Sequence, residues 1–186
     1  MPVPSPSDVA DRALVLHALV RRAAIELALE GFGDDPVRRA QAERARAETD
    51  RWLETEALAP ALTDTERGLL EAPSGAWPRE AVADGMWRKE ALGTLLWALQ
   101  HVPSLPAPDE EFEGSVLEAV ITRYGSVSSF RANGLARDDR QIEDAWLTAD
   151  AWLGISEGSD DHTTASICAE RSRALGWLRN ASAPAP

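Results

Sequence analysis

The sequence predicts an all-α fold, a compact single-domain bundle of about six or seven helices around a central amino-terminal helix. Apolar residues recur at three- and four-residue spacing through most of the chain. No useful run alternates polar and apolar residues, so no strand is expected. The 186 residues suffice for one domain with a good core and are few for two domains.

The first helix is expected over about residues 7–30. Ser7 or Asp8 suits its amino end, and Gly31-Phe32-Gly33 provides a stop. Its polar residues form a narrow strip and nearly all others are apolar, which is typical of a helix buried on most sides. We therefore expect this helix to run through the middle of the fold.

Capping signals and helix breakers define six further helices. Asp35 precedes a first-turn proline, and Thr63 and Ser115 each begin a capping box. Gly125 and Gly154 are expected to end two of the helices. The six are expected over about residues 36–58, 64–71, 78–101, 115–125, 138–154 and 164–179. Residues 126–134 fit either a helix or a loop, whereas 103–114 and 155–162 are expected to be loops.

The two ends of the chain differ in composition from the rest. Residues 1–6 and 181–186 are rich in proline and are expected to be disordered tails around a domain of residues 7–180. The start has no basic and apolar signal segment, and the most apolar run, 13–20, is too short to span a bilayer. We therefore expect a cytoplasmic protein.

Charge and cysteine content exclude several classes of partner. A net charge of −12 disfavours nucleic acid and anionic membranes, since both attract basic surfaces. Arginines are interleaved with the acids, which disfavours a nucleic-acid mimic. The one cysteine, Cys168, excludes an internal disulfide and lies beside Ile167, so a buried, inert thiol is expected. Seven tryptophans indicate a rigid core or a pocket that stacks flat ligands, of which the core is the more common case.

The most informative residue is Arg171, which interrupts an apolar helix face formed with Ile167, Ala174 and Leu178. A buried guanidinium requires a partner, and Glu90 on another semi-apolar helix face is the natural one. A structural ion pair that fixes helix register is the favoured reading. The functional reading is a pocket in which Arg171 holds an anionic ligand and tryptophans stack on it. The candidate ligand-binding residues are Trp87, Arg88, Glu90, Trp97, Glu170, Arg171, Arg173 and Trp177.

No metal site, cofactor or catalytic group is predicted. The three histidines, His17, His101 and His162, have no ligand at helical spacing. Asp160-Asp161-His162 can hold a cation, but caps and solvated charge explain such a loop better. Gly31-Phe32-Gly33 lacks the third glycine and the strand of a dinucleotide fingerprint. Catalytic residues stay unknown, and the sequence does not decide whether the protein is an enzyme.

Four blocks of sequence resemble an uncharacterised bacterial family catalogued as domain of unknown function 4272. They are Val9 to Leu16, Trp52-Leu53-Glu54 with Leu58, Leu62 and Glu66, Trp87 to Leu92 with Leu95 to Leu99, and Glu170 to Leu178. The resemblance covers about residues 7–106 and 135–179, without an amino-terminal segment usual in that family. It implies an all-helical bacterial protein and supplies no activity. Ser172 and Gly176 stand where the family would have His and Asn, so no polar site is carried over.

The leading expectation is a cytoplasmic, non-catalytic binding or interaction module for a protein or small ligand. The alternative is an enzyme or small-molecule binder with an Arg/Glu/Trp pocket for an anionic or aromatic ligand. A third reading is an acidic inhibitor or immunity protein that shields a basic partner. The first reading requires an exposed apolar patch and the second a deep, partly polar cavity.

Overall fold

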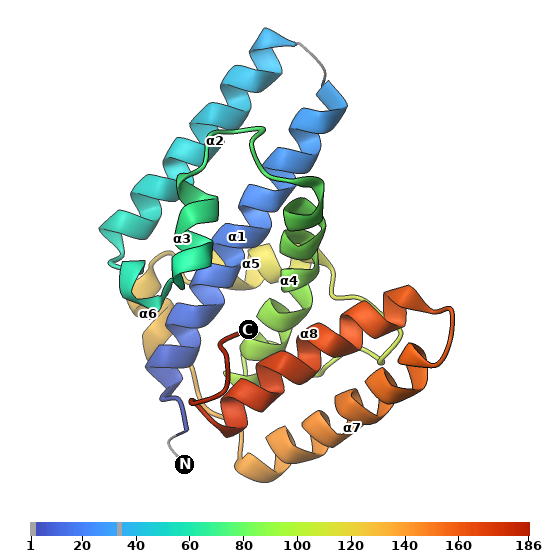
Figure 1. Ribbon diagram of the computed structural model, residues 1–186. Helices are drawn as coiled ribbons and strands as arrows, with labels where there is room; N and C mark the ends of the chain where they lie inside the picture. The colour runs from blue at the N-terminus through green and yellow to red at the C-terminus, as the bar shows by residue number, and fades with distance from the viewer. Residues whose placement is uncertain (1–2, 33–34) are drawn as a thin grey trace. The chain divides into compact units, whose positions relative to one another are not determined.

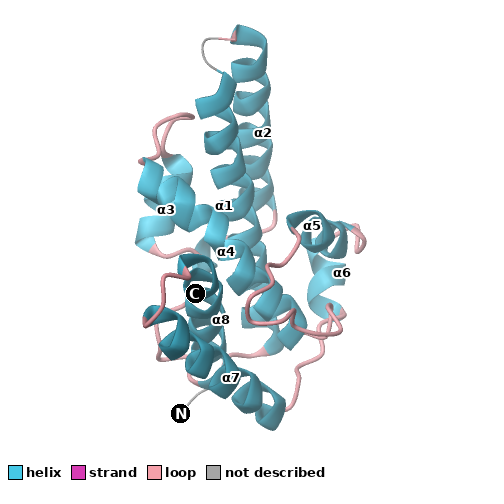
Figure 2. Cartoon of the chain, turned by 90° about the vertical axis from the view of Figure 1, so that its right-hand side faces the viewer, coloured by secondary structure: helices cyan, strands magenta, loops and turns pink. Residues whose placement is uncertain are grey.

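The computed structural model describes residues 3–32 and 35–186. Over these residues the chain forms eight α-helices and one short 3-10 helix, and no strand (Figures 1 and 2). The helices are α1 (Pro6–Phe32), α2 (Pro36–Thr55), η1 (Ala59–Ala61), α3 (Asp64–Glu71), α4 (Arg79–Ala98), α5 (Gly114–Thr122), α6 (Val127–Ala132), α7 (Asp139–Glu157) and α8 (His162–Arg179). The all-α prediction is confirmed. The helix beyond the predicted seven is α6, which lies in the segment that fitted either helix or loop.

Most helix starts follow the predicted caps. Asp35 accepts hydrogen bonds from the first turn of α2, Thr63 forms the capping box of α3 with Glu66, and Asp138 caps α7. The first helix starts earlier than expected, because Ser5 and Asp8 cap it reciprocally through each other's backbone N–H groups.

Several predicted helix boundaries are wrong, and α2 and α5 end at Thr55 and Thr122, each three residues before the predicted end. The helix α5 starts at Gly114 after Glu113, which makes no side-chain cap, and not at a Ser115 capping box. Gly154 does not end α7, which continues to Glu157, because one glycine lowers helix propensity by only about 1 kcal/mol. The helix α4 ends at Ala98, since Gln100 adopts a positive φ of 60° and breaks the helical path. The predicted stop at Gly33 lies outside the described residues.

The chain divides into two compact units. The terminal unit comprises residues 1–13 and 89–186, and the inner unit comprises residues 14–88. The division falls within α1 and within α4. The single domain of residues 7–180, its central first helix and the disordered tails stay predictions; Met1 and Pro2 of the first tail lie outside the described residues.

The inner unit contains most of α1, with α2, η1, α3 and the start of α4. Its buried apolar side chains include Leu16, Leu53, Leu58 and Leu70. The polar strip predicted on the first helix is only partly solvated, because Arg22 and Glu26 are both buried.

The terminal unit contains the rest of α4 and the helices α5 to α8. Leu95, Phe130, Ile167 and Leu175 are fully buried in it. The helices α7 and α8 pack side by side, as both views show. The loop that follows α4, residues 103–113, contributes Phe112 to this core.

Candidate functional site

Arg171 on α8 and Glu90 on α4 form the ion pair predicted from their helix faces. Glu90 Oε2 accepts hydrogen bonds from Arg171 Nη2 at 2.8 Å and from Nε at 3.1 Å. The Arg171 side chain is only 4% exposed and the Glu90 side chain is 0% exposed. Burial raises the pKa of Glu90, and the charge and hydrogen bonds of Arg171 oppose that rise.

The remaining N–H groups of Arg171 bind the backbone of the 103–113 loop. Nη1 donates to the carbonyl oxygens of Pro106 at 3.1 Å and Ala107 at 3.0 Å, and Nη2 donates to the carbonyl of Glu110. A guanidinium has five N–H groups, and all five have an acceptor inside the chain. An anionic ligand would therefore have to displace one of these internal acceptors.

Glu90 and Phe112 complete the arrangement on the carboxylate side. Glu90 Oε1 accepts a hydrogen bond from the N–H of Phe112 at 2.9 Å. The Phe112 ring lies 5.2 Å from the Arg171 guanidinium carbon and packs against Gly93, where a Cβ would come within 2.5 Å of ring carbons. The pair thus holds a loop by its carbonyls at one end and by an aromatic residue at the other.

The inner unit contains the same arrangement, which was not predicted from the sequence. Arg22 Nε donates to Glu26 Oε1 at 2.9 Å, and its Nη2 donates to the carbonyls of Ala72 at 2.8 Å and Pro73 at 2.9 Å. Glu26 Oε2 accepts the N–H of Trp77 at 3.4 Å. We call each such set a guanidinium clamp: a buried Arg–Glu pair, loop carbonyls on the arginine, and a loop amide on the carboxylate.

The inner clamp also has an aromatic residue, Trp77, that packs against a glycine of α4, Gly85. The Trp77 ring lies 5.7 Å from the Arg22 guanidinium carbon, and its Nε1 donates to the carbonyl of Leu69 at 2.7 Å. A Cβ at Gly85 would lie 3.0 Å from this ring. Arg22 lies within a mostly apolar helix, as Arg171 does, but it belongs to the narrow polar strip of the first helix, where a solvated charge is equally expected.

The other candidate residues do not gather around Arg171. Glu170 is buried on α8 and pairs with the exposed Arg173, and Trp177 is buried on the same helix. The Trp97 ring lies 4.6 Å from the guanidinium carbon of Arg137, whose Nε donates to the Trp97 carbonyl at 2.7 Å. Trp87 and Arg88 are half-buried and belong to the inner unit. The structure therefore joins Glu90 with Arg171 and Glu170 with Arg173.

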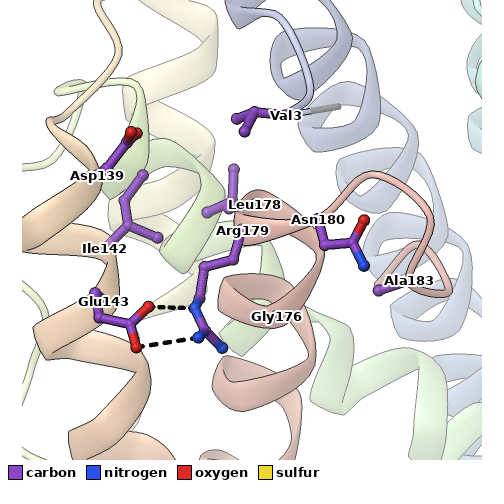
Figure 3. A pocket seen from close by; sticks show the side chains of 9 residues that line it. All are labelled: Val3, Asp139, Ile142, Glu143, Gly176, Leu178, Arg179, Asn180 and Ala183. Carbon is purple, nitrogen blue, oxygen red and sulfur yellow. Dashed lines mark hydrogen bonds and ion pairs between the residues drawn. The ribbon is translucent and has the colours of Figure 1, made fainter. Parts of the chain in front are cut away.

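Two pockets in the terminal unit flank α8. One, of about 170 Å³, lies against Arg171 and is lined mainly by apolar groups of the 103–113 loop, α7 and α8. The other, of about 470 Å³, is drawn in Figure 3. Arg179 reaches across it to Glu143 with two hydrogen bonds, and Ile142 and Leu178 lie beside this pair. Arg179 is thus already engaged by a carboxylate of its own chain.

The acidic loop before α8 acts as a helix cap. Asp161 accepts hydrogen bonds from the Thr164 N–H at 3.0 Å and from its hydroxyl at 2.7 Å, and these bonds lower the pKa of Asp161. Within residues 3–32 and 35–186 no three His, Cys, Asp or Glu side chains are grouped to hold a metal ion. No helix in the same residues is long and apolar enough to cross a membrane.

His101 is a buried histidine, and its pKa is shifted. Its Nδ1 lies 2.7 Å from the Tyr124 hydroxyl, its ring contacts those of Tyr124 and Phe130, and the Arg123 guanidinium lies close to it. Burial lowers the pKa of His101 below 6.5, and the charge of Arg123 lowers it further.

This shift predicts a loss of stability in mild acid. As the pH falls below 6.5, the unfolded chain takes up a proton at His101 that the folded chain does not yet bind, so the free energy of unfolding decreases as the pH decreases. Above pH 6.5 His101 is neutral in both states, and this loss of stability is absent. Urea unfolding of the wild type and of His101→Gln at several pH values checks this, and equal pH dependence in the two proteins contradicts it.

Together these features define, over residues 3–32 and 35–186, an all-helical protein with two guanidinium clamps. The chain matches the family described as "Domain of unknown function (DUF4272)" over residues 1–184, and it belongs to that family. The match includes the loop and helices between residues 107 and 134, which the sequence resemblance had left unassigned. No curated protein and no solved structure matches the chain.

Proposed function

We propose that this chain is a non-catalytic interaction module that binds a partner protein through the outward face of α7. Leu147, Trp152 and Ile155 are 52%, 40% and 63% exposed on that helix. Leu147 and Ile155 lie on the side of α7 away from Ile142 and Ala149, which are buried, and Trp152 lies at the edge of that side. Clustered exposed apolar side chains of this kind mark protein interaction sites.

The spacing of these residues makes one continuous surface. Leu147, Ala151 and Ile155 follow one another at four-residue intervals, and Trp152 lies next to them around the helix. Tryptophan is among the residues that contribute most to binding energy at protein interfaces. This exposed surface is the observation that carries the proposal.

The charge around α7 supports a protein partner over nucleic acid or an anionic membrane. The helix carries five acidic residues and one basic residue, and Asp144, Asp150 and Glu157 are exposed. Negative charge repels both phosphates and anionic lipids. A cytoplasmic location is part of the proposal and rests on the sequence alone.

The alternative, an enzyme or small-molecule binder centred on Arg171, has less support. Its arginine donates every N–H to Glu90 or to loop carbonyls, so no donor faces a ligand. We therefore assign Glu90 and Arg171 a structural role within the interaction module.

Site-specific photo-crosslinking in the host tests the proposal. A photoreactive amino acid at Ala151 is expected to capture a discrete polypeptide, whereas the same group at the exposed Val116 on α5 should not. Adding Leu147→Ser and Ile155→Ser should abolish the capture while the fold is retained. Equal capture at both positions, or none at Ala151, contradicts the proposal.

A further inference from the structure

The pocket beside Arg171 has room for a small ligand group, but the polar groups on its wall are not available to form hydrogen bonds with a ligand. Its volume is about 170 Å³, and Leu105, Pro108, Ala149 and Leu175 form much of its wall. An apolar cavity of about 150 Å³ binds a molecule the size of benzene. The pocket therefore matches one aliphatic or aromatic group.

The polar groups on the pocket wall are already bonded within the chain. All N–H groups of Arg171 are engaged, as described above. The Thr148 hydroxyl donates to the carbonyl of Asp144 at 2.9 Å, and the Cys168 thiol lies 3.6 Å from the carbonyl of Pro108. Burial raises the pKa of Cys168, so the thiol stays neutral. These saturated groups favour an uncharged ligand without hydrogen-bonding atoms.

The surroundings of the pocket are acidic. Asp109 and Asp161 are exposed and lie near enough to Cys168 that their charges contribute to its raised pKa. Asp144 is exposed one turn before Thr148 on α7. Because these aspartates are negatively charged, a partner segment that inserts an apolar side chain here binds best when basic residues flank that side chain.

The pocket lies beside the Trp152 edge of the outward face of α7. Thr148 lines the pocket, and Trp152 follows it by four residues on the same side of the helix. A partner bound along Trp152 therefore has the pocket within one helical turn. A second copy of this chain would bring two acidic helices together, which disfavours it as the occupant.

We propose that this pocket receives one aliphatic or aromatic anchor side chain of the partner, and that basic residues flanking the anchor pair with Asp109, Asp144 and Asp161. The inference rests on the proposed interaction function and names the chemistry of the partner. Burying such an anchor should raise the affinity at least about tenfold.

Synthetic peptides test the anchor directly. The probe is a short peptide with a central phenylalanine flanked by lysines, compared with one in which alanine replaces the phenylalanine and one in which glutamates replace the lysines. By calorimetry the full-length protein should bind the first peptide about tenfold more tightly than either of the others. Equal binding of the phenylalanine and alanine peptides overturns the proposal.

A pocket-filling variant locates the anchor. Ala149→Leu places a larger side chain on the pocket wall and should remove the preference for phenylalanine, whereas Ala119→Leu on the exposed surface of α5 should keep it. In the wild type, the phenylalanine peptide at about ten times its Kd should slow modification of Cys168 by a small thiol reagent about tenfold. This second measurement needs no substitution, and an unchanged rate overturns the proposal.

The outcomes separate the two proposals. If Ala149→Leu keeps the peptide preference while crosslinking at Ala151 persists, the pocket assignment fails and the interaction surface on α7 stands. If crosslinking at Ala151 also fails, both proposals fail. Dimerisation through this pocket, shown by sedimentation and abolished by Ala149→Leu, overturns the assignment of a basic partner.

Discussion

Arg171→Met is expected to lower the free energy of unfolding by about 3–5 kcal/mol, the range for removing one partner of a buried ion pair. The change leaves the Glu90 carboxylate without its cation. It also leaves the carbonyls of Pro106, Ala107 and Glu110 without their donor. Urea unfolding followed by tryptophan fluorescence measures the effect.

Two further variants show whether burial of the charge is responsible. Arg38→Met breaks an ion pair whose two side chains are both exposed, so it should change the free energy of unfolding by less than about 1 kcal/mol. Adding Glu90→Met to Arg171→Met should restore part of the lost stability, because no isolated buried carboxylate remains. Wild-type stability in Arg171→Met would show that the clamp has no structural role.

Gly93→Ala is expected to destabilise the protein by about 1–3 kcal/mol, the usual penalty for overpacking a core. The added methyl group would come within 2.5 Å of the ring of Phe112, which is buried and cannot swing into solvent. Displacing that ring also disturbs the Phe112 amide that donates to Glu90. Thermal and urea unfolding measure the change.

Gly68→Ala is the matched control, because Gly68 also lies within a helix but a methyl group added there would have no neighbouring atom within 4 Å. At this position alanine should be neutral or stabilising by up to about 1 kcal/mol through helix propensity. If Gly93→Ala is as well tolerated as Gly68→Ala, close packing of Phe112 on α4 is not important for stability.

The helices and part of one clamp could be predicted from the sequence. Arg171 is recognisable because a charge within an apolar helix face requires a partner, and Glu90 lies on a similar face. Arg22 and Glu26 fit solvated positions by their spacing, since residues four apart on a helix commonly pair at the surface. Only the three-dimensional structure shows that α1 is buried around Arg22 and Glu26, on the side of the helix that carries its polar residues.

The loop acceptors could not be predicted, for a physical reason. Every residue has a backbone carbonyl, so the carbonyls of Pro106 and Ala107 carry no signature in the amino-acid type. The glycines on which the aromatic rings pack, Gly93 and Gly85, could not be predicted either, because a glycine within a helix does not reveal which side chain packs on it. The α7 surface was not identified either, although its exposed residues have regular spacing, because the inward and outward faces of α7 are both apolar in places.

The guanidinium clamp has a consequence for how its loop opens. A strand at a sheet edge can detach one residue at a time, because each residue has its own hydrogen bonds. The segment from Pro106 to Phe112 instead shares one arginine–glutamate pair, so releasing either end leaves the same two charges short of partners. Opening of this segment should therefore be all-or-none, with a single amide-exchange free energy along its length instead of a gradient from one end.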